Sequence, residues 1–184
     1  MVDSAAVMNK TTLIERVNTE YDPFEDRIKL IVGTKDDDTY IIWLTQKLLR
    51  KVFTHLFKWL AEHLPESPAS RSKDAQVANQ LQDFAQQNAM ANMRPGKPVD
   101  SQNTSRTWLV REMDIRKLEQ GVVLVFKDEE HREACLPLNS QQLRQWLVVV
   151  YHHWVKAEWP VDLWPQWIRK SVEPGAIASS RPVH

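Results

Sequence analysis

The sequence predicts an α+β fold with antiparallel meander sheets of about six strands, two long amphipathic helices and one polar bridging helix. Two observations predict it. Residues 28–63 align without a gap on residues 122–157, at an offset of 94, and 15 of the 18 apolar positions in the first window meet apolar residues in the second. Each window also reads as two strands joined by a charged turn and followed by a helix. This pattern suggests an internal βββα duplication.

The match between the two windows is one of pattern, since only four positions are identical. These positions are Leu30/Leu124, Leu44/Leu138, Leu49/Leu143 and Arg50/Arg144. Two unrelated segments that share a strand–strand–helix layout are the alternative to duplication, and both hypotheses predict the same fold class. If the halves face each other, the natural site is the groove where they meet or the surface built by both long helices.

We expect residues 1–10 to be a flexible N-terminus and residues 11–66 to form the first βββα half. Alternating or β-branched residues predict the strands, and polar, charged stretches predict the turns between them. The expected elements are strands over residues 11–17, 27–33 and 39–44 and a helix over residues 46–63. Thr45 stands where the helix N-cap hydroxyl is wanted, and Pro65 ends the helix.

Residues 67–106 are expected to form a polar helix and a linker between the halves. Residues 73–92 are rich in alanine and glutamine and lack glycine and proline, which predicts a helix. The apolar stripe of this helix is thin and consists of Val77, Leu81 and Phe84, with Ala85 as a marginal fourth member. Such a polar helix is expected to lie on the surface and to bridge the halves. Prolines and a glycine make residues 94–106 a loop.

Residues 107–170 repeat the plan of the first half and end in a strap rich in tryptophan and proline. The expected elements are strands over residues 107–115, 122–127 and 133–138 and a helix over residues 141–159, capped by Asn139 or Ser140. Residues 171–184 lack apolar periodicity and are expected to be a flexible tail. The whole chain is expected to be one compact domain.

Composition narrows the class of protein. Apolar residues make up 42% of the chain and charged residues 26%, a balance typical of globular proteins. The 24 basic residues equal the 24 acidic ones, which argues against a surface wholly devoted to nucleic acid or membrane. Cys135 is the single cysteine, so a reducing compartment fits best. The sequence shows neither a signal peptide nor a membrane-length apolar run, and we expect a soluble cytoplasmic protein.

Tryptophan is concentrated near the end of the chain, where Trp159, Trp164 and Trp167 alternate with prolines. Prolines favour an extended or turning path, so the segment can strap across the body and insert its rings into the core. Alternatively it offers a rigid aromatic surface to a partner, because tryptophan is enriched at binding hot spots. The three tryptophans are therefore our first candidate partner-binding residues, with the strap as the favoured interpretation.

The first long helix carries a basic face formed by Lys47, Lys51 and Lys58. These side chains lie opposite the apolar stripe, where an anionic partner could contact them. An ordinary solvated face is the favoured interpretation, because the net charge is zero and the second helix is much less basic. The three lysines are our second set of candidate partner-binding residues.

The sequence assigns no catalytic, cofactor-binding or metal-ligating residue. A loose set formed by Glu130, His131, Glu133 and Cys135 is the best material for a metal site or a nucleophile. A metal site needs three or four convergent ligands, and the turn at His131 supplies two. Phosphate-binding and nucleophile-elbow motifs are missing from the sequence.

These observations together favour a non-catalytic protein–protein interaction or assembly module that uses no cofactor. We expect the partner to be another protein, which includes the case of a second copy of this chain. We do not expect it to be a membrane. The first alternative is a nucleic-acid-associated protein that uses the basic helix face. The second alternative is an enzyme or metal protein without a recognisable motif.

Overall fold

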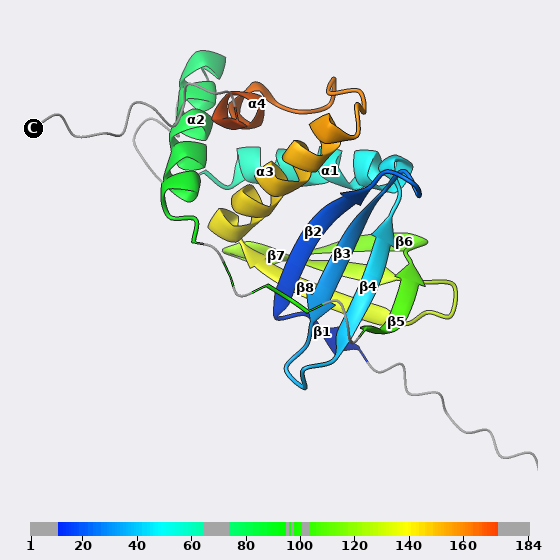
Figure 1. The fold of residues 1–184 in the computed structure, drawn as a ribbon. Helices are drawn as coiled ribbons and strands as arrows, with labels where there is room; N and C mark the ends of the chain where they lie inside the picture. The colour runs from blue at the N-terminus through cyan, green and yellow to red at the C-terminus, as the bar shows by residue number, and fades with distance from the viewer. Residues whose placement is uncertain (1–10, 65–73, 95, 97, 101–103, 173–184) are drawn as a thin grey trace, which may run out of the picture.

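The computed structural model describes residues 11–64, 74–94, 96, 98–100 and 104–172 and is shown in Figure 1. In this part of the chain it is an α+β fold with four helices and two mixed four-stranded sheets. The α+β class expected from the sequence is confirmed. The expected flexible ends lie outside the described residues, except for residues 171 and 172, which belong to the last helix.

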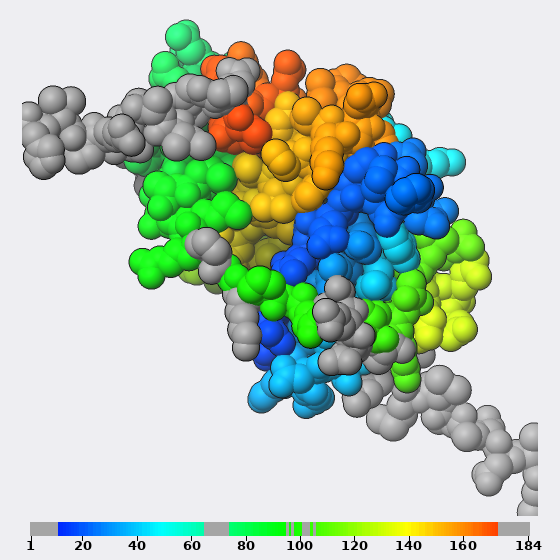
Figure 2. All heavy atoms as spheres, viewed as in Figure 1, coloured from blue at the N-terminus to red at the C-terminus, as the bar shows by residue number. Residues whose placement is uncertain are grey.

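The first sheet has the strand order β2-β3-β4-β5. Its strands are β2 (Arg16–Asp22), β3 (Arg27–Gly33), β4 (Thr39–Leu44) and β5 (Thr104–Leu109). The first three form an antiparallel meander, whereas β5 lies parallel to β4. Residues 98–100 lie against the outer face of this sheet (Figure 2). There the Asn18 side chain donates to the Val99 carbonyl oxygen at 3.4 Å.

The second sheet has the strand order β1-β8-β7-β6. Its strands are β1 (Thr12–Leu13), β6 (Glu112–Lys117), β7 (Gly121–Lys127) and β8 (Glu133–Asn139). Strands β6, β7 and β8 form an antiparallel meander, and β1 lies parallel to β8. The first half of the chain thus supplies the fourth strand of the second sheet, and the second half supplies the fourth strand of the first.

The expectation of about six strands in purely antiparallel meanders was wrong. The two segments predicted as single strands, residues 11–17 and 107–115, each hold two strands that belong to different sheets. The chain stays extended through both changes of sheet, so the alternation of residues shows no break. We call these two changes of sheet the crossovers.

Main-chain hydrogen bonds fix each crossover. The Ile14 N–H donates to the Cys135 carbonyl oxygen of β8 at 2.8 Å, and the next N–H, of Glu15, donates to Gly33 of β3 at 3.0 Å. In the second crossover, the Val110 N–H donates to Trp43 of β4 at 3.1 Å. The following N–H, of Arg111, donates to Lys127 of β7 at 2.8 Å. Two neighbouring residues thus tie the two sheets together at each place.

The two long helices follow the meanders. Helix α1 (Gln46–Glu62) and helix α3 (Ser140–Lys156) have bounds that differ by 94 residues at both ends, as do β3 and β7. The Thr45 hydroxyl accepts from the Leu48 N–H at 3.3 Å, so the predicted N-cap is confirmed. Helix α3 ends before the predicted residue 159, because Glu158 adopts a φ of 56°.

Two further helices cover α3. Helix α2 (Ala75–Ala91) packs against α3 and α4 (Gln166–Val172). Helix α4 was not predicted; it starts directly after Pro165, whose fixed φ suits a first helical turn. The predicted apolar stripe of α2 was also wrong in part. Phe84 is 69% exposed, whereas Gln82, Gln86 and Ala89 are buried.

One hydrophobic core lies between the sheets and the long helices. Its largest fully buried side chains include Phe53, Trp59, Phe126 and Trp154. Aromatic rings therefore fill much of the space between α1 and α3. None of the helices in the described part of the chain is long and apolar enough to cross a membrane.

Candidate functional site

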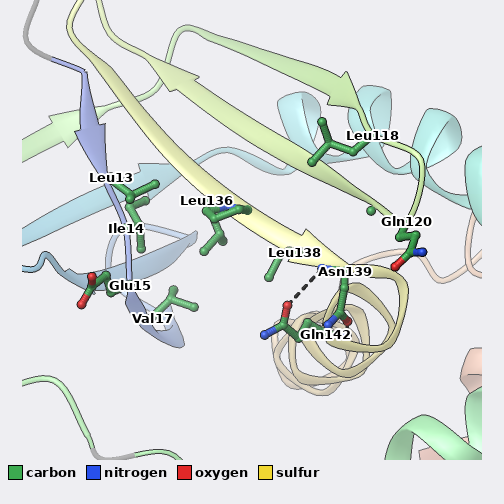
Figure 3. A pocket seen from close by; sticks show the side chains of 12 residues that line it. Leu13, Ile14, Glu15, Val17, Leu118, Gln120, Leu136, Leu138, Asn139 and Gln142 are labelled. Carbon is green, nitrogen blue, oxygen red and sulfur yellow. Dashed lines mark hydrogen bonds between the residues drawn. The ribbon is translucent and has the colours of Figure 1, made fainter.

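The first crossover opens into a groove of about 770 Å³, which we call the junction groove (Figure 3). It lies between the two halves of the chain, at β1, the start of β2, the end of β8, the β6–β7 turn and the first turn of α3. Its lining residues are Leu13, Ile14, Glu15, Val17, Leu118, Gln120, Gly121, Leu136, Pro137, Leu138, Asn139 and Gln142. A groove is thus present where the two halves of the chain meet, and its use as a binding site stays a prediction.

The groove is open because β1 pairs with β8 only at Ala134 and Cys135, after which the first crossover turns to the other sheet. The first crossover bonds to Cys135, so residues 136–139 of β8 continue past it without a parallel neighbour among the described residues. The second crossover bonds to Trp43, and β4 ends one residue later, at Leu44. The longer overhang of β8 gives the junction groove its apolar floor.

The walls of the groove are apolar. Leu136 and Leu138 are buried and form the floor, whereas Leu13 is 54% exposed and Leu118 is 52% exposed at opposite sides (Figure 3). Exposed apolar side chains around a concave surface are typical of binding sites, because contact with a partner removes them from water. The groove therefore offers apolar area as its main source of binding free energy.

Two of the polar residues of the groove, Asn139 and Gln142, form hydrogen bonds with each other. The Asn139 N–H donates to the Gln142 side chain at 3.0 Å, and the Gln142 N–H donates to the Asn139 side chain at 2.8 Å. This capping box fixes the start of α3. Glu15 is the single ionisable side chain among the twelve lining residues. The groove wall thus carries one negative charge, and the hydrogen-bonding groups of Asn139 and Gln142 are already used within the chain.

The backbone edge of β8 is protected against strand addition. The Cys135 carbonyl faces the crossover, so alternation places the main-chain groups of Pro137 and Asn139 on the same side. Proline has no N–H to donate, and the Asn139 N–H is bonded to Gln142. We therefore expect a partner to bind here through side-chain packing rather than by extending the sheet.

The second crossover forms a smaller hollow of about 220 Å³, which we call the basic hollow. Its lining residues are Thr45, Lys47, Leu48, Lys51, Leu109, Val110 and Arg111. The two sites correspond along the chain, because Thr45 and Leu48 lie 94 residues before Asn139 and Gln142. Their charges are opposite, since Arg111 stands in the second crossover where Glu15 stands in the first.

The three predicted lysines are all exposed on α1. Lys47 and Lys51 line the basic hollow, and Lys58 lies further along the same helix, 3.9 Å from Glu62. The structure adds Arg111, which forms an ion pair with Glu129. Sequence reasoning missed Arg111 because the crossover that brings it to α1 leaves no local signal.

The three predicted tryptophans are buried, and they present no exposed aromatic surface. The Trp164 ring packs against Phe53 and Tyr151, with ring centroids 5.1 and 5.0 Å apart. The Trp159 indole N–H donates to Asp26 at 2.8 Å, and Trp167 lies under the guanidinium of Arg144. This placement matches the strap interpretation. The aromatic binding surface, which was the alternative, does not form in this arrangement.

The loose set around His131 does not converge. Glu133 lies near Lys127 and Arg116, and burial raises the pKa of the Cys135 thiol. His131 sits in the turn with a φ of 58°. Across the described residues, no three histidine, cysteine, aspartate or glutamate side chains gather in a way that could hold a metal ion.

Comparison of this chain with family models, with curated proteins and with solved structures finds no match.

Proposed function

We propose that the protein is a non-catalytic interaction module that binds an apolar segment of a partner protein in the junction groove. The single observation that carries this proposal is the groove itself, with about 770 Å³ of space and two half-exposed leucines at its sides. The partner would insert two or three apolar side chains between Leu13 and Leu118, over the floor formed by Leu136 and Leu138.

The lining favours a protein segment over a small polar ligand. A small molecule of good affinity needs several convergent polar groups to orient it. Here the amides of Asn139 and Gln142 already serve the cap of α3, and Glu15 is the one charge. Binding free energy would come from apolar burial, at roughly 25 cal/mol per Å². A chain segment with apolar side chains on one face can bury such area.

The same lining supports a non-catalytic role. General acid–base or nucleophilic chemistry uses a positioned pair of groups, such as a nucleophile beside its base. Glu15 has no second ionisable side chain beside it in the lining. We also infer a cytoplasmic location, in which the thiol of Cys135 stays reduced.

A photo-crosslinking amino acid at position 118 tests the proposal in cells. We expect it to capture a defined partner protein, and the added variant Leu13→Glu should abolish the capture. The matched control is the same crosslinker at position 84, because Phe84 is also an exposed apolar side chain but lies on α2. Equal products from both positions would contradict the proposal.

Nucleic-acid association through α1 is the second candidate function. The exposure of Lys47, Lys51 and Lys58 on one helix favours it, together with Arg111 beside the first two. Labelled single- and double-stranded oligonucleotides are the probes. This candidate predicts binding that weakens steeply with salt and that is lost in Lys51→Glu. Undetectable or salt-insensitive binding would remove it.

We further propose that the two halves arose by duplication of one βββα unit. The common offset of 94 residues in β3/β7 and α1/α3 supports this proposal, as does the matching exchange of a strand between the sheets. Separate expression of residues 11–66 tests it: an ancestral-like unit is expected to form a homodimer that mimics the two halves. If residues 11–66 stay unfolded even when mixed with residues 104–172, the proposal that one βββα unit pairs with another is contradicted.

A further inference from the structure

The turn between β2 and β3 presents an aromatic side chain almost wholly to solvent. Phe24 is 98% exposed, the highest value among the large apolar side chains of the described residues that stand out on the surface. The backbone beneath it is held in place, because the Asp22 carboxylate accepts from the N–H groups of Phe24 and Glu25 at 3.0 and 3.1 Å. An apolar ring on a fixed turn is available for contact at little entropic cost.

The base of this turn is tied to the core of the molecule. Asp26 adopts a φ of 50°, and its carboxylate accepts from the Tyr21 hydroxyl at 2.9 Å and from the Trp159 indole at 2.8 Å. The turn is also acidic, since it holds Asp22, Glu25 and Asp26, and Glu25 forms an exposed ion pair with Arg27 at 3.4 Å. We call residues 22–26 the acidic tip.

The basic hollow has the complementary character. Lys47, Lys51 and Arg111 surround it, and Leu48 and Leu109 supply an apolar lining. Its volume of about 220 Å³ is below the usual range of small-molecule pockets. A single aromatic side chain is an occupant of suitable size. Carboxylates next to it in the chain would meet Lys47 and Lys51, and also Arg111, which pairs with Glu129 within the chain.

The β2–β3 turn, the end of β4 and the start of α1 lie at the same end of the first sheet (Figure 1). The turn carries the acidic tip, and Thr45 and Lys47 at the start of α1 line the basic hollow. The strand register shows why, since Ile28 pairs with Leu44 and Trp43 pairs with Leu109 at this end. The tip joins β2 to β3, and the hollow lies beyond β4 and β5. A twofold axis between them, roughly normal to the sheet, would bring the tip of each copy to the hollow of the other.

We propose that the partner of the basic hollow is a second copy of this chain, whose Phe24 enters the hollow while its Glu25 and Asp22 face Lys47, Lys51 and Arg111. The interface is isologous, so two such contacts form at once. Equal numbers of acidic and basic residues leave no net repulsion between copies. The junction groove is a poorer receptor for the tip, because its one charge is that of Glu15.

Sedimentation velocity of the full chain over a range of concentrations tests this proposal. We expect a monomer–dimer equilibrium that shifts toward monomer as salt rises, because charge pairs contribute to it. Phe24→Ser should remove the dimer without loss of folding, since the ring packs on nothing. The matched control is Phe84→Ser, an equally drastic change at another exposed phenylalanine, which should leave the equilibrium unchanged.

A charge exchange tests the pairing directly. Glu25→Lys and Lys51→Glu should each weaken the dimer at least tenfold, and the double variant should restore it because the two charges swap places. Lys35→Glu, an exposed lysine on the β3–β4 turn, is the control and should have no effect. A wild-type chain that stays monomeric to about 1 mM would overturn the proposal. A dimer that survives Phe24→Ser and Lys51→Glu would overturn it too.

These outcomes are independent of the junction groove. Loss of crosslinking at position 118 concerns the proposed partner protein, whereas the sedimentation measurement uses this chain alone.

Discussion

Arg50 and Arg144 occupy the same position of the two long helices, 94 residues apart, and meet opposite environments. Arg50 forms two hydrogen bonds of 3.0 and 2.8 Å with the exposed carboxylate of Asp162. Arg144 is 3% exposed and donates at 2.6 Å to the neutral side chain of Gln82. Burial lowers the pKa of Arg144 to about 10. In the described part of the chain, no carboxylate contacts this guanidinium.

Arg144 therefore carries a buried charge that lowers the stability of the fold. Replacing Arg144 together with its partner Gln82 should raise the free energy of unfolding. We expect the double variant Arg144→Met, Gln82→Leu to be about 1–2 kcal/mol more stable than the wild type, because a desolvated charge is removed and no side-chain acceptor is left alone. Urea unfolding measures the free energy. The loss of the Gln82 bond to the Leu60 carbonyl opposes the gain, and a net loss of stability would contradict the prediction.

His153 should make the protein less stable in mild acid. Burial, then the charges of His152 and Lys156, lowers the pKa of His153 below 6.5, although the Thr19 backbone and Glu20 act in the opposite sense. The unfolded chain then binds the proton more tightly than the folded one. Stability is full above pH 6.5 and falls as the pH drops from there toward the folded pKa.

The check is the unfolding free energy at about pH 7.5 and about pH 5. We expect His153→Gln to reduce the difference between the two values. His55→Gln is the control, because His55 is exposed on α1. An unchanged pH dependence in His153→Gln would refute this assignment.

Gly121 allows the close approach of β7 to β8 at the junction groove. A Cβ atom at this position would clash with the Leu138 carbonyl oxygen, which belongs to the strand backbone and cannot move aside easily. We expect Gly121→Ala to lower stability by about 1–3 kcal/mol, measured by thermal or urea unfolding. Gly96→Ala is the matched control, because open space surrounds that position. Similar effects of both substitutions would show that the clash is not the cause.

Substitution of Trp164 tests whether this residue stabilises the core or contacts the partner. Its ring packs against Phe53, Tyr151 and Trp154 in the core. We expect Trp164→Ala to lower stability by about 3–5 kcal/mol. Crosslinking from position 118, normalised to folded protein, should stay at the wild-type level. A loss of capture in a folded variant would instead place Trp164 in the binding surface.

Local signals predicted the last two strands of each meander and the starts of the two long helices. The strands over residues 27–33 and 39–44 and the cap at Thr45 match the structure, because β-branched runs, charged turns and cap residues act over a few positions. The strand partners were not predictable in this way. The crossovers at Ile14 and Val110 depend on hydrogen bonds to residues far along the chain.

In the candidate site, too, the features set by local sequence were predictable and those set by long-range contacts were not. The exposed lysines followed from helical periodicity, whereas Arg111 reaches them through the second crossover. The apolar pattern of α2 was a poor guide to its buried face, because Gln82 is buried as the hydrogen-bond acceptor of Arg144, a tertiary contact that overrides the local pattern. The junction groove was expected only as a place between the halves, since its lining comes from five separate elements.

The exchange of β1 and β5 between the sheets has a consequence for synthesis and folding. The first sheet lacks its last strand until residue 109 has left the ribosome, and the second sheet uses both an early strand and late ones. Neither half can complete its hydrogen bonding alone, so local unfolding of one half exposes an edge of the other. The chain should therefore melt in one cooperative transition, and cleavage between its halves should leave two fragments that stay associated.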